Sequence, residues 1–169
     1  PWFVESMQSE DNPKTDWYVW VDPKDDGGPP NNWLSTFGGS AWSYHPLRRK
    51  HYFHKFLRSQ PKLNWREPHA KQAALGVLRN WLSKGVDGFR LDVANAFLHD
   101  DKLRDNPPIP PNMRGKMHWA HAPNMQRRMH DANLPENRKV LDEVRAVVEG
   151  YQDRFVFGEF SEEPGLIGE

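Results

Sequence analysis

The chain has 169 residues, about the size of one ordinary domain. Its 23 Lys and Arg residues balance its 23 Asp and Glu residues, so the composition does not favour a nucleic-acid-binding surface. The absence of cysteine excludes disulfides and thiolate metal sites, and no stretch approaches the roughly 20 apolar residues of a membrane span.

The first part of the chain, residues 1–66, is punctuated by prolines, glycine pairs and tryptophans. Such punctuation disfavours long helices. Two stretches, 16–21 and 50–56, have the aromatic and β-branched residues that strands prefer. We therefore expect a loop-rich lobe with small strands over residues 1–66.

From Pro68 the pattern becomes helical. Proline suits the first turn of a helix, and apolar residues recur at helical spacing as far as Trp81. Gly85 is placed to end this helix in the left-handed conformation. Alternating apolar residues then predict a strand over 86–93.

A second helix and strand follow at 133–149 and 154–159. Asn133 with Glu136 three residues later resembles a capping box at the start of this helix. Helices alternating with short apolar strands are typical of parallel βα units. Two such units cannot close a parallel sheet, so this part is expected to be an interior slice of a larger α/β fold.

The connection 94–132 is long for a compact domain, and connections of this length are often functional. It follows the C-terminal end of a strand, where α/β folds keep their active sites. It carries His118, His121 and His130. The first two are three residues apart with no third ligand at a telling spacing, so no metal site is predicted.

Two carboxylates end the two predicted strands: Asp92 and Glu159. If the strands are adjacent and parallel, both side chains reach the same rim, where they can divide into a nucleophile and an acid/base. Arg90 lies two residues before Asp92, on the same side of the strand, and would keep it ionised. Alternatively, Asp92 caps a turn, Glu159 is solvated and Arg90 forms a structural ion pair.

Two segments, 88–92 (Gly-Phe-Arg-Leu-Asp) and 157–159 (Phe-Gly-Glu), resemble the central motifs of glycoside hydrolase family 13, the α-amylase family. Further segments resemble its oligo-1,6-glucosidase and α-glucosidase branch: 11–14, 17–20, 30–33, 37–42 and 60–64. The resemblance covers essentially the whole chain.

This resemblance implies an α/β fold, a partial (β/α)8 TIM barrel around its fourth and fifth strands. Residues 1–66 would be most of an inserted domain B, and residues 67–169 a segment of the catalytic barrel. Asp92 matches the family's nucleophile, Glu159 its general acid/base, and Arg90 the arginine beside the nucleophile, expected to bind substrate.

By the same matching, Phe37 and Phe56 fall where this branch places aromatics near the bound glucose. Aromatic faces suit the apolar face of a sugar, although such residues also serve as packing. Val93, directly after the nucleophile, resembles the α-1,6-cleaving members. It can equally be a β-branched strand residue.

The implied function is a retaining α-glucosidase that hydrolyses short α-glucosides by double displacement. This mechanism needs the carboxyl groups about 5–5.5 Å apart and no metal or cofactor. The expected partner is a small oligosaccharide, with no nucleic acid and no membrane, and the lack of cysteine predicts a cytoplasmic location. Transglycosylation or sugar isomerisation through the same intermediate, or a non-catalytic binding relative, are the alternatives.

The sequence also departs from the family. The first motif, an Asp and an Asn-His pair, is expected before Pro1, and the His-Asp motif after Glu169, so we expect an internal fragment that is inactive alone. In the branch motif Gln-Pro-Asp-Leu-Asn, Lys62 replaces the aspartate. Sequence reasoning gives no account of this lysine.

Overall fold

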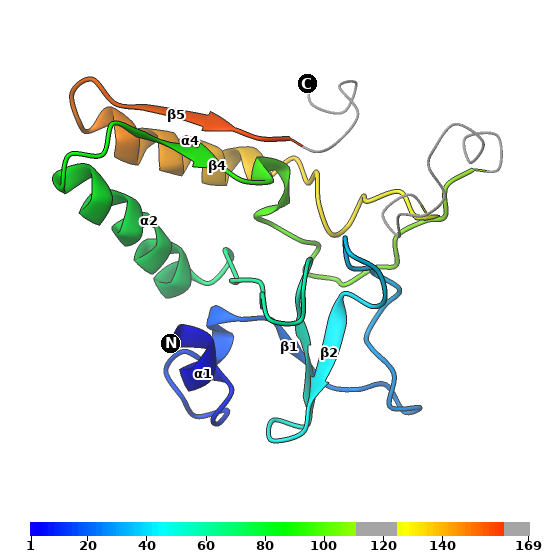
Figure 1. Ribbon diagram of the computed structural model, residues 1–169. Helices are drawn as coiled ribbons and strands as arrows, with labels where there is room; N and C mark the ends of the chain where they lie inside the picture. The colour runs from blue at the N-terminus through cyan, green and yellow to red at the C-terminus, as the bar shows by residue number, and fades with distance from the viewer. Residues whose placement is uncertain (111–124, 161–169) are drawn as a thin grey trace.

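The computed structural model describes residues 1–110 and 125–160 (Figure 1). An antiparallel sheet of three short strands lies in the first third of the chain, and two parallel strands lie with two helices in the part that follows residue 67. No helix in the described ranges is long and apolar enough to cross a bilayer. In chain order the helices, 3-10 turns and strands are α1 (Trp2–Ser6), η1 (Thr15–Trp17), β1 (Trp20–Val21), β2 (Trp42–His45), β3 (Lys50–Phe53), α2 (Pro68–Ser83), β4 (Gly88–Leu91), η2 (Ala94–Ala96), α4 (Asn137–Glu149) and β5 (Phe155–Gly158).

The antiparallel sheet has the strand order β1-β3-β2 and an aromatic core. Trp42 pairs with Phe53 across β2 and β3, and the fully buried Trp33 lies 5.2 Å from the Phe53 ring. The predicted strand at 16–21 is wrong over its first half, because residues 15–17 form η1; Tyr18 makes an isolated bridge with Leu63, and the strand itself is β1. The predicted strand at 50–56 is confirmed as β3, which ends at Phe53.

The parallel pairing of the last two strands is confirmed, with Leu91 of β4 opposite Gly158 of β5. Helices α2 and α4 cover one face of this pair, where Leu75 and Leu82 pack against Val144 and Val148. Burial of each such aliphatic side chain stabilises the folded state by roughly 1.5–3 kcal/mol. Within the described residues the two strands form no closed barrel, and Phe155 and Phe157 stack on the exposed opposite face.

Glycines act at two points where the chain must turn or approach closely. Gly85 follows α2 with φ +91°, which confirms the predicted left-handed end of that helix. Gly88 begins β4 so close to the carbonyl oxygen of Phe155 that a Cβ atom would clash with it. The tight pairing of β4 with β5 therefore requires glycine at position 88.

The predicted start of the second helix and the predicted end of the strand at 86–93 are wrong. Helix α4 begins at Asn137, and no side chain caps its N-terminus. Asn133 instead adopts φ +59°, and its side-chain oxygen accepts a hydrogen bond from the Asn95 amide. The chain comes back beside η2 here, so Asn133 bonds to η2 rather than to the start of α4. Strand β4 ends at Leu91 rather than residue 93, because Val93 turns into the left-handed region at φ +46°.

A buried polar cluster joins the first lobe to the connection after η2. The Asp131 carboxylate accepts a hydrogen bond from Lys55 at 3.0 Å and another from the Asn106 amide at 2.9 Å. Arg128 lies 3.6 Å from the same carboxylate, and Asp131 is completely buried. Burial raises the pKa of Asp131, but the attraction of Lys55 and Arg128 outweighs it and lowers the pKa below its ordinary value.

Side-chain amides and an indole extend this junction. Asn32 donates to the carbonyl of Asn106 and accepts from its backbone N–H, both at 2.9 Å. The Trp33 indole donates to the carbonyl of Arg104 at 2.9 Å. The connection 94–132 was predicted to be functional, but its residues 100–106 mainly hold the lobe in place. His118 and His121 lie outside the described residues.

Removing the charge of Asp131 should destabilise the protein strongly. We expect Asp131→Asn to lower the free energy of unfolding by about 3–5 kcal/mol, because Lys55 and Arg128 stay buried without their carboxylate. Urea unfolding measures this loss. The matched control is Asp142→Asn, which removes an exposed carboxylate paired with Arg138 and should cost less than about 1 kcal/mol. Equal losses in both variants would contradict the argument.

Candidate active site

One guanidinium holds the two carboxylates predicted to do chemistry. Arg90 lies 3.0 Å from Asp92 through its Nη1 atom and 2.7 Å from Glu159 through its Nη2 atom. The register of β4 with β5 explains this, because Asp92 and Glu159 directly follow the paired residues Leu91 and Gly158. The structure therefore brings the three predicted residues together at one edge of the strand pair.

These side chains lie on the accessible side of the sheet edge, with Asp92 71% exposed and Glu159 45% exposed. Charge-assisted bonds from the guanidinium fix the orientation of both carboxyl groups. Two oriented carboxylates at one rim suit nucleophilic and acid/base chemistry, provided that a substrate can reach them. Arg90 contacts both, so it acts here as a positioning residue.

The turn after Asp92 is strained and tightly held. Val93 has φ +46° and ψ +53°, which for a β-branched residue costs about 1–3 kcal/mol. The next backbone N–H, of Ala94, donates to the carbonyl of Glu159 at 2.7 Å, and the N–H of Glu159 donates to Leu91 at 2.8 Å. The interpretation of Val93 as an ordinary strand residue is thus wrong, and η2 has no side-chain cap from Asp92.

A hollow of about 210 Å³ opens beside Asp92, and we call it the Asp92 hollow. The lobe supplies Phe56, Gln60 and Lys62 to its wall, while Val93 and Phe97 come from the β4 side. Phe97 also packs on Trp65, 4.7 Å between ring centroids. Sequence reasoning did not single out Trp65 or Phe97, because only the approach of the lobe to η2 brings them to this wall.

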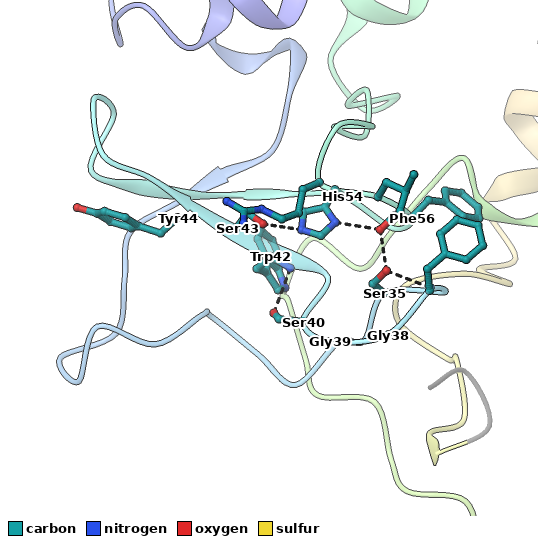
Figure 2. Close-up of a pocket in the computed structure, with 12 residues that line it drawn as sticks. Ser35, Gly38, Gly39, Ser40, Trp42, Ser43, Tyr44, His54 and Phe56 are labelled. Carbon is teal, nitrogen blue, oxygen red and sulfur yellow. Dashed lines mark hydrogen bonds between the residues drawn. The ribbon is translucent and has the colours of Figure 1, made fainter. Parts of the chain in front are cut away.

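Phe37 and Phe56, predicted to lie near a bound sugar, are neighbours with ring centroids 6.0 Å apart. Phe37 is 68% exposed and is not a packing residue of the lobe core. Phe56 lines the Asp92 hollow and also a second hollow, shown in Figure 2. The structure therefore places only Phe56 of this pair on the wall next to Asp92.

Lys62, which the sequence left unexplained, fastens the lobe to the segment after η2. Its ammonium group donates to the carbonyl of Leu98 at 3.3 Å and lies 5.1 Å from the Phe53 ring centroid. Arg66 makes a matching contact, donating twice to the carbonyl of His99. Burial lowers the pKa of Lys62 well below its ordinary value, and the nearby charge of Lys55 adds to this shift.

No cluster of three His, Cys, Asp or Glu residues with metal-binding geometry occurs within 1–110 and 125–160. In those ranges His130 lies 3.9 Å from Asp100 through its Nδ1 atom, and no third His, Cys, Asp or Glu side chain joins this pair in a metal-binding group.

A family model described as "Alpha amylase, catalytic domain" matches residues 1–165. The chain is 59% identical over 114 residues to a "Probable alpha-glucosidase" of Rhizobium meliloti, covering 68% of this chain and 21% of that protein. It is 45% identical over 108 residues to an oligo-1,6-glucosidase of Parageobacillus thermoglucosidasius, covering 64% of this chain and 19% of that protein.

Solved structures agree. The crystal structure of an α-glucosyl transfer enzyme matches 95% of this chain with a TM-score of 0.89 and 44% identity. A trehalose-6-phosphate hydrolase of Bacillus licheniformis matches 96% of it with a TM-score of 0.80 and 31% identity. The chain spans about a fifth of these curated relatives and 26–30% of these solved chains.

His99, which directly follows Leu98 in the chain, is buried, and its imidazole packs edge-on against Trp33 and Phe53 of the lobe core. Burial lowers the pKa of His99 to about 3, and the charges of Lys62 and Arg66 add to the effect. The ring therefore stays neutral in the folded protein at pH values where an unfolded histidine has already bound a proton.

Stability should consequently fall as the pH drops from about 6.5 towards 4, since the unfolded state binds a proton that folded His99 cannot. The expected slope from this residue is at most roughly 1.4 kcal/mol per pH unit. Urea unfolding of wild type and His99→Phe between pH 7 and 4.5 measures it, above the range where buried carboxylates titrate. The variant should show a flatter pH dependence, and parallel curves would refute this assignment.

Proposed function

We propose, because this chain belongs to the α-amylase family of glycoside hydrolases, that it supplies the nucleophile and the general acid/base of a retaining α-glucosidase. The observation that carries the proposal is the Arg90 guanidinium, bonded to both Asp92 and Glu159 at the edge of an aromatic-lined hollow. Both carboxylates are present, which argues against a purely binding relative.

In the proposed reaction, Asp92 attacks the anomeric carbon of an α-glucoside while Glu159 gives its proton to the departing glycosidic oxygen. A covalent glucosyl ester on Asp92 results. Glu159, now ionised, takes a proton from a water molecule, whose oxygen displaces Asp92 and releases glucose. Arg90 holds the Asp92 carboxyl group in position for the first step through their 3.0 Å contact.

The surroundings of Asp92 support a sugar as the ligand. Phe56 offers an aromatic face beside the carboxylate, and Phe37 stands next to it. Val93 is held in a strained conformation on the wall of the same hollow. Strain of this kind gathers at functional sites, which supports a role for this side chain in choosing the α-1,6 over the α-1,4 linkage.

We further propose that the chain acts within a (β/α)8 barrel, with residues 1–66 as most of an inserted domain B. The exposed stack of Phe155 and Phe157 supports this, because side chains on the inner face of barrel strands fill the barrel core. The whole activity would then need residues from other parts of that barrel.

A second candidate is transfer of the glucosyl unit to a sugar hydroxyl instead of water. Its support is the likeness to an α-glucosyl transfer enzyme at 44% identity and to trehalulose and isomaltulose synthases at 31–35%. Both reactions share the ester on Asp92 and differ in the acceptor. Product analysis by chromatography after incubation with maltose or sucrose separates glucose release from new disaccharides.

The decisive test uses the full-length protein and p-nitrophenyl α-glucoside. Asp92→Asn should lower kcat by several orders of magnitude, because it removes the covalent nucleophile. Glu159→Gln should also lower kcat for this substrate. The loss should come mainly from slower hydrolysis of the glucosyl ester, because nitrophenolate is a good leaving group and departs with little help from an acid. A burst of nitrophenol followed by a slow phase would report the trapped intermediate.

The matched control is Asp87→Asn, which removes an exposed carboxylate just before β4 and should keep activity near that of wild type. Full activity of Asp92→Asn would sink the assignment of the nucleophile. An inactive wild type, with folding verified by circular dichroism, would sink the hydrolase proposal.

Linkage preference gives a further prediction. Wild type should cleave isomaltose with a higher kcat/KM than maltose, and Val93→Thr should lower this ratio about tenfold, because it replaces a methyl group in the hollow by a hydroxyl of the same shape. Threonine keeps the β-branch, so the backbone strain is matched in both proteins. An unchanged ratio would show that Val93 does not select the linkage.

A further inference from the structure

The 3-10 turn η2, which follows β4 and Asp92, lies beside the start of α4 (Figure 1). The side chain of Asn137, the first residue of α4, joins the two and is only 5% exposed. A buried side-chain amide costs free energy unless its polar atoms are hydrogen-bonded. The partners of this amide therefore show what the residue does.

The Asn137 amide bonds to the backbone of η2 at both ends of the turn. Its nitrogen donates to the carbonyl oxygen of Ala94 at 2.6 Å. Its oxygen accepts from the backbone N–H groups of Phe97 and Leu98, at 3.1 and 3.2 Å. Because a carbonyl only accepts and a backbone N–H only donates, these partners fix the orientation of the amide. All three bonds go to the segment directly after the proposed nucleophile.

Ala94 is the point where the end of β5 and the start of α4 meet the turn. Its N–H donates to the carbonyl oxygen of Glu159 at 2.7 Å, and its own carbonyl accepts from Asn137. Ala94 is completely buried, and a Cβ atom on Gly158 would lie only 2.9 Å from its Cβ atom. The Ala94 backbone is thus held on one side by Glu159 and on the other by Asn137.

The left-handed conformation of Val93 depends on this hold. With φ +46° and ψ +53°, Val93 has a conformation that a β-branched residue keeps only where its surroundings impose it. Val93 lies between Asp92 and Ala94, so its backbone angles set the direction in which the chain leaves Asp92. If Ala94 were released on the α4 side, relaxation of Val93 would shift the Asp92 carboxylate relative to Glu159.

A second pair of amides limits how far the turn can move. The Asn95 side chain donates to the side-chain oxygen of Asn133 at 2.7 Å, and the Asn133 N–H donates to the carbonyl of Asn95 at 2.9 Å. These bonds hold the middle of η2 and do not involve Asn137. Loss of the Asn137 amide should therefore displace the turn without detaching it from the fold.

We propose that Asn137 is a positioning residue for the reaction: by holding Ala94 it keeps Val93 in the left-handed turn and the Asp92 carboxylate at the point of attack. The inference rests on the proposed function for the role of Asp92. Asn137 contacts the turn and not the reacting atoms, so its loss should slow the attack and leave substrate binding nearly unchanged. A displacement of roughly 1 Å in a reacting group can cost about 100-fold in rate.

The test measures the attack by Asp92 in the full-length protein. Single-turnover release of nitrophenol from p-nitrophenyl α-glucoside, with enzyme in excess, reports this step directly. Asn137→Leu removes all three hydrogen bonds at similar side-chain volume. It should lower the maximal rate constant about 10- to 100-fold and change the half-saturating concentration less than about twofold.

The matched control is Val148→Ala, near the other end of the same helix. Val148 is 2% exposed and packs in the core between α2 and α4, so its truncation lowers stability without touching η2. Both variants are compared at a temperature where circular dichroism shows full folding. Val148→Ala should keep the wild-type rate constant. A wild-type rate in Asn137→Leu, or an equal loss in the control, would show that Asn137 is merely structural.

A second variant covers the case in which leucine prevents folding. Asn137→Asp keeps the shape and can still accept from Phe97 and Leu98, but it sets a carboxylate oxygen against the carbonyl of Ala94. A negative charge at the start of α4 suits the helix dipole, so the helix should persist. We expect the same 10- to 100-fold loss, roughly, in the single-turnover rate constant.

Hydrogen exchange separates this inference from the proposed function, because it needs no catalysis. The Ala94 N–H is bonded to Glu159 and not to Asn137, so its exchange reports the position of the turn. In either Asn137 variant it should exchange at least about tenfold faster than in wild type, relative to the Val144 amide within α4. If the wild type proves inactive, the hydrolase proposal fails and this exchange alone decides whether Asn137 holds the turn. Unchanged exchange overturns the inference, and so does faster exchange with an unchanged rate in an active enzyme.

Discussion

Parallel pairing of β4 with β5 in one register sets the geometry of the candidate site. With Leu91 opposite Gly158, the next residues along both strands arrive at the same edge, and Arg90 reaches both carboxylates from within β4. A shift by one residue would turn Arg90 to the helix-covered face, because side chains alternate along a strand. Glycine at position 88 allows the close approach on which this register depends.

The lobe completes the site through contacts made far along the chain. Lys55 is bonded to Asp131 and Lys62 to Leu98, so the segment after β3 that carries Phe56 is fixed against the segment that follows Asp92. Burying the Lys55–Asp131 ion pair costs desolvation free energy, and burying either charge without its partner would cost more. The fold therefore favours the one arrangement in which the two groups meet. This specificity gives the Asp92 hollow a defined wall rather than a variable gap.

Phe56 is the common wall of two hollows with different characters. One contains a carboxylate held by arginine and a strained valine, which suit bond cleavage. The other contains a hydrogen-bonded serine–histidine pair, with the Ser43 hydroxyl 2.8 Å from Nε2 of His54.

The sequence by itself determined the helix from Pro68, its end at Gly85, the parallel strand pair, the family and the placement of Arg90 beside Asp92. These follow from local periodicity, glycine and proline conformation, and two characteristic motifs. Only the tertiary structure decided the left-handed turn at Val93, the late start of α4 and the roles of Lys62 and Asp131. Each depends on partners distant in sequence, such as Lys55 with Asp131, and the energy of such contacts overrides local propensity without leaving a periodic signal.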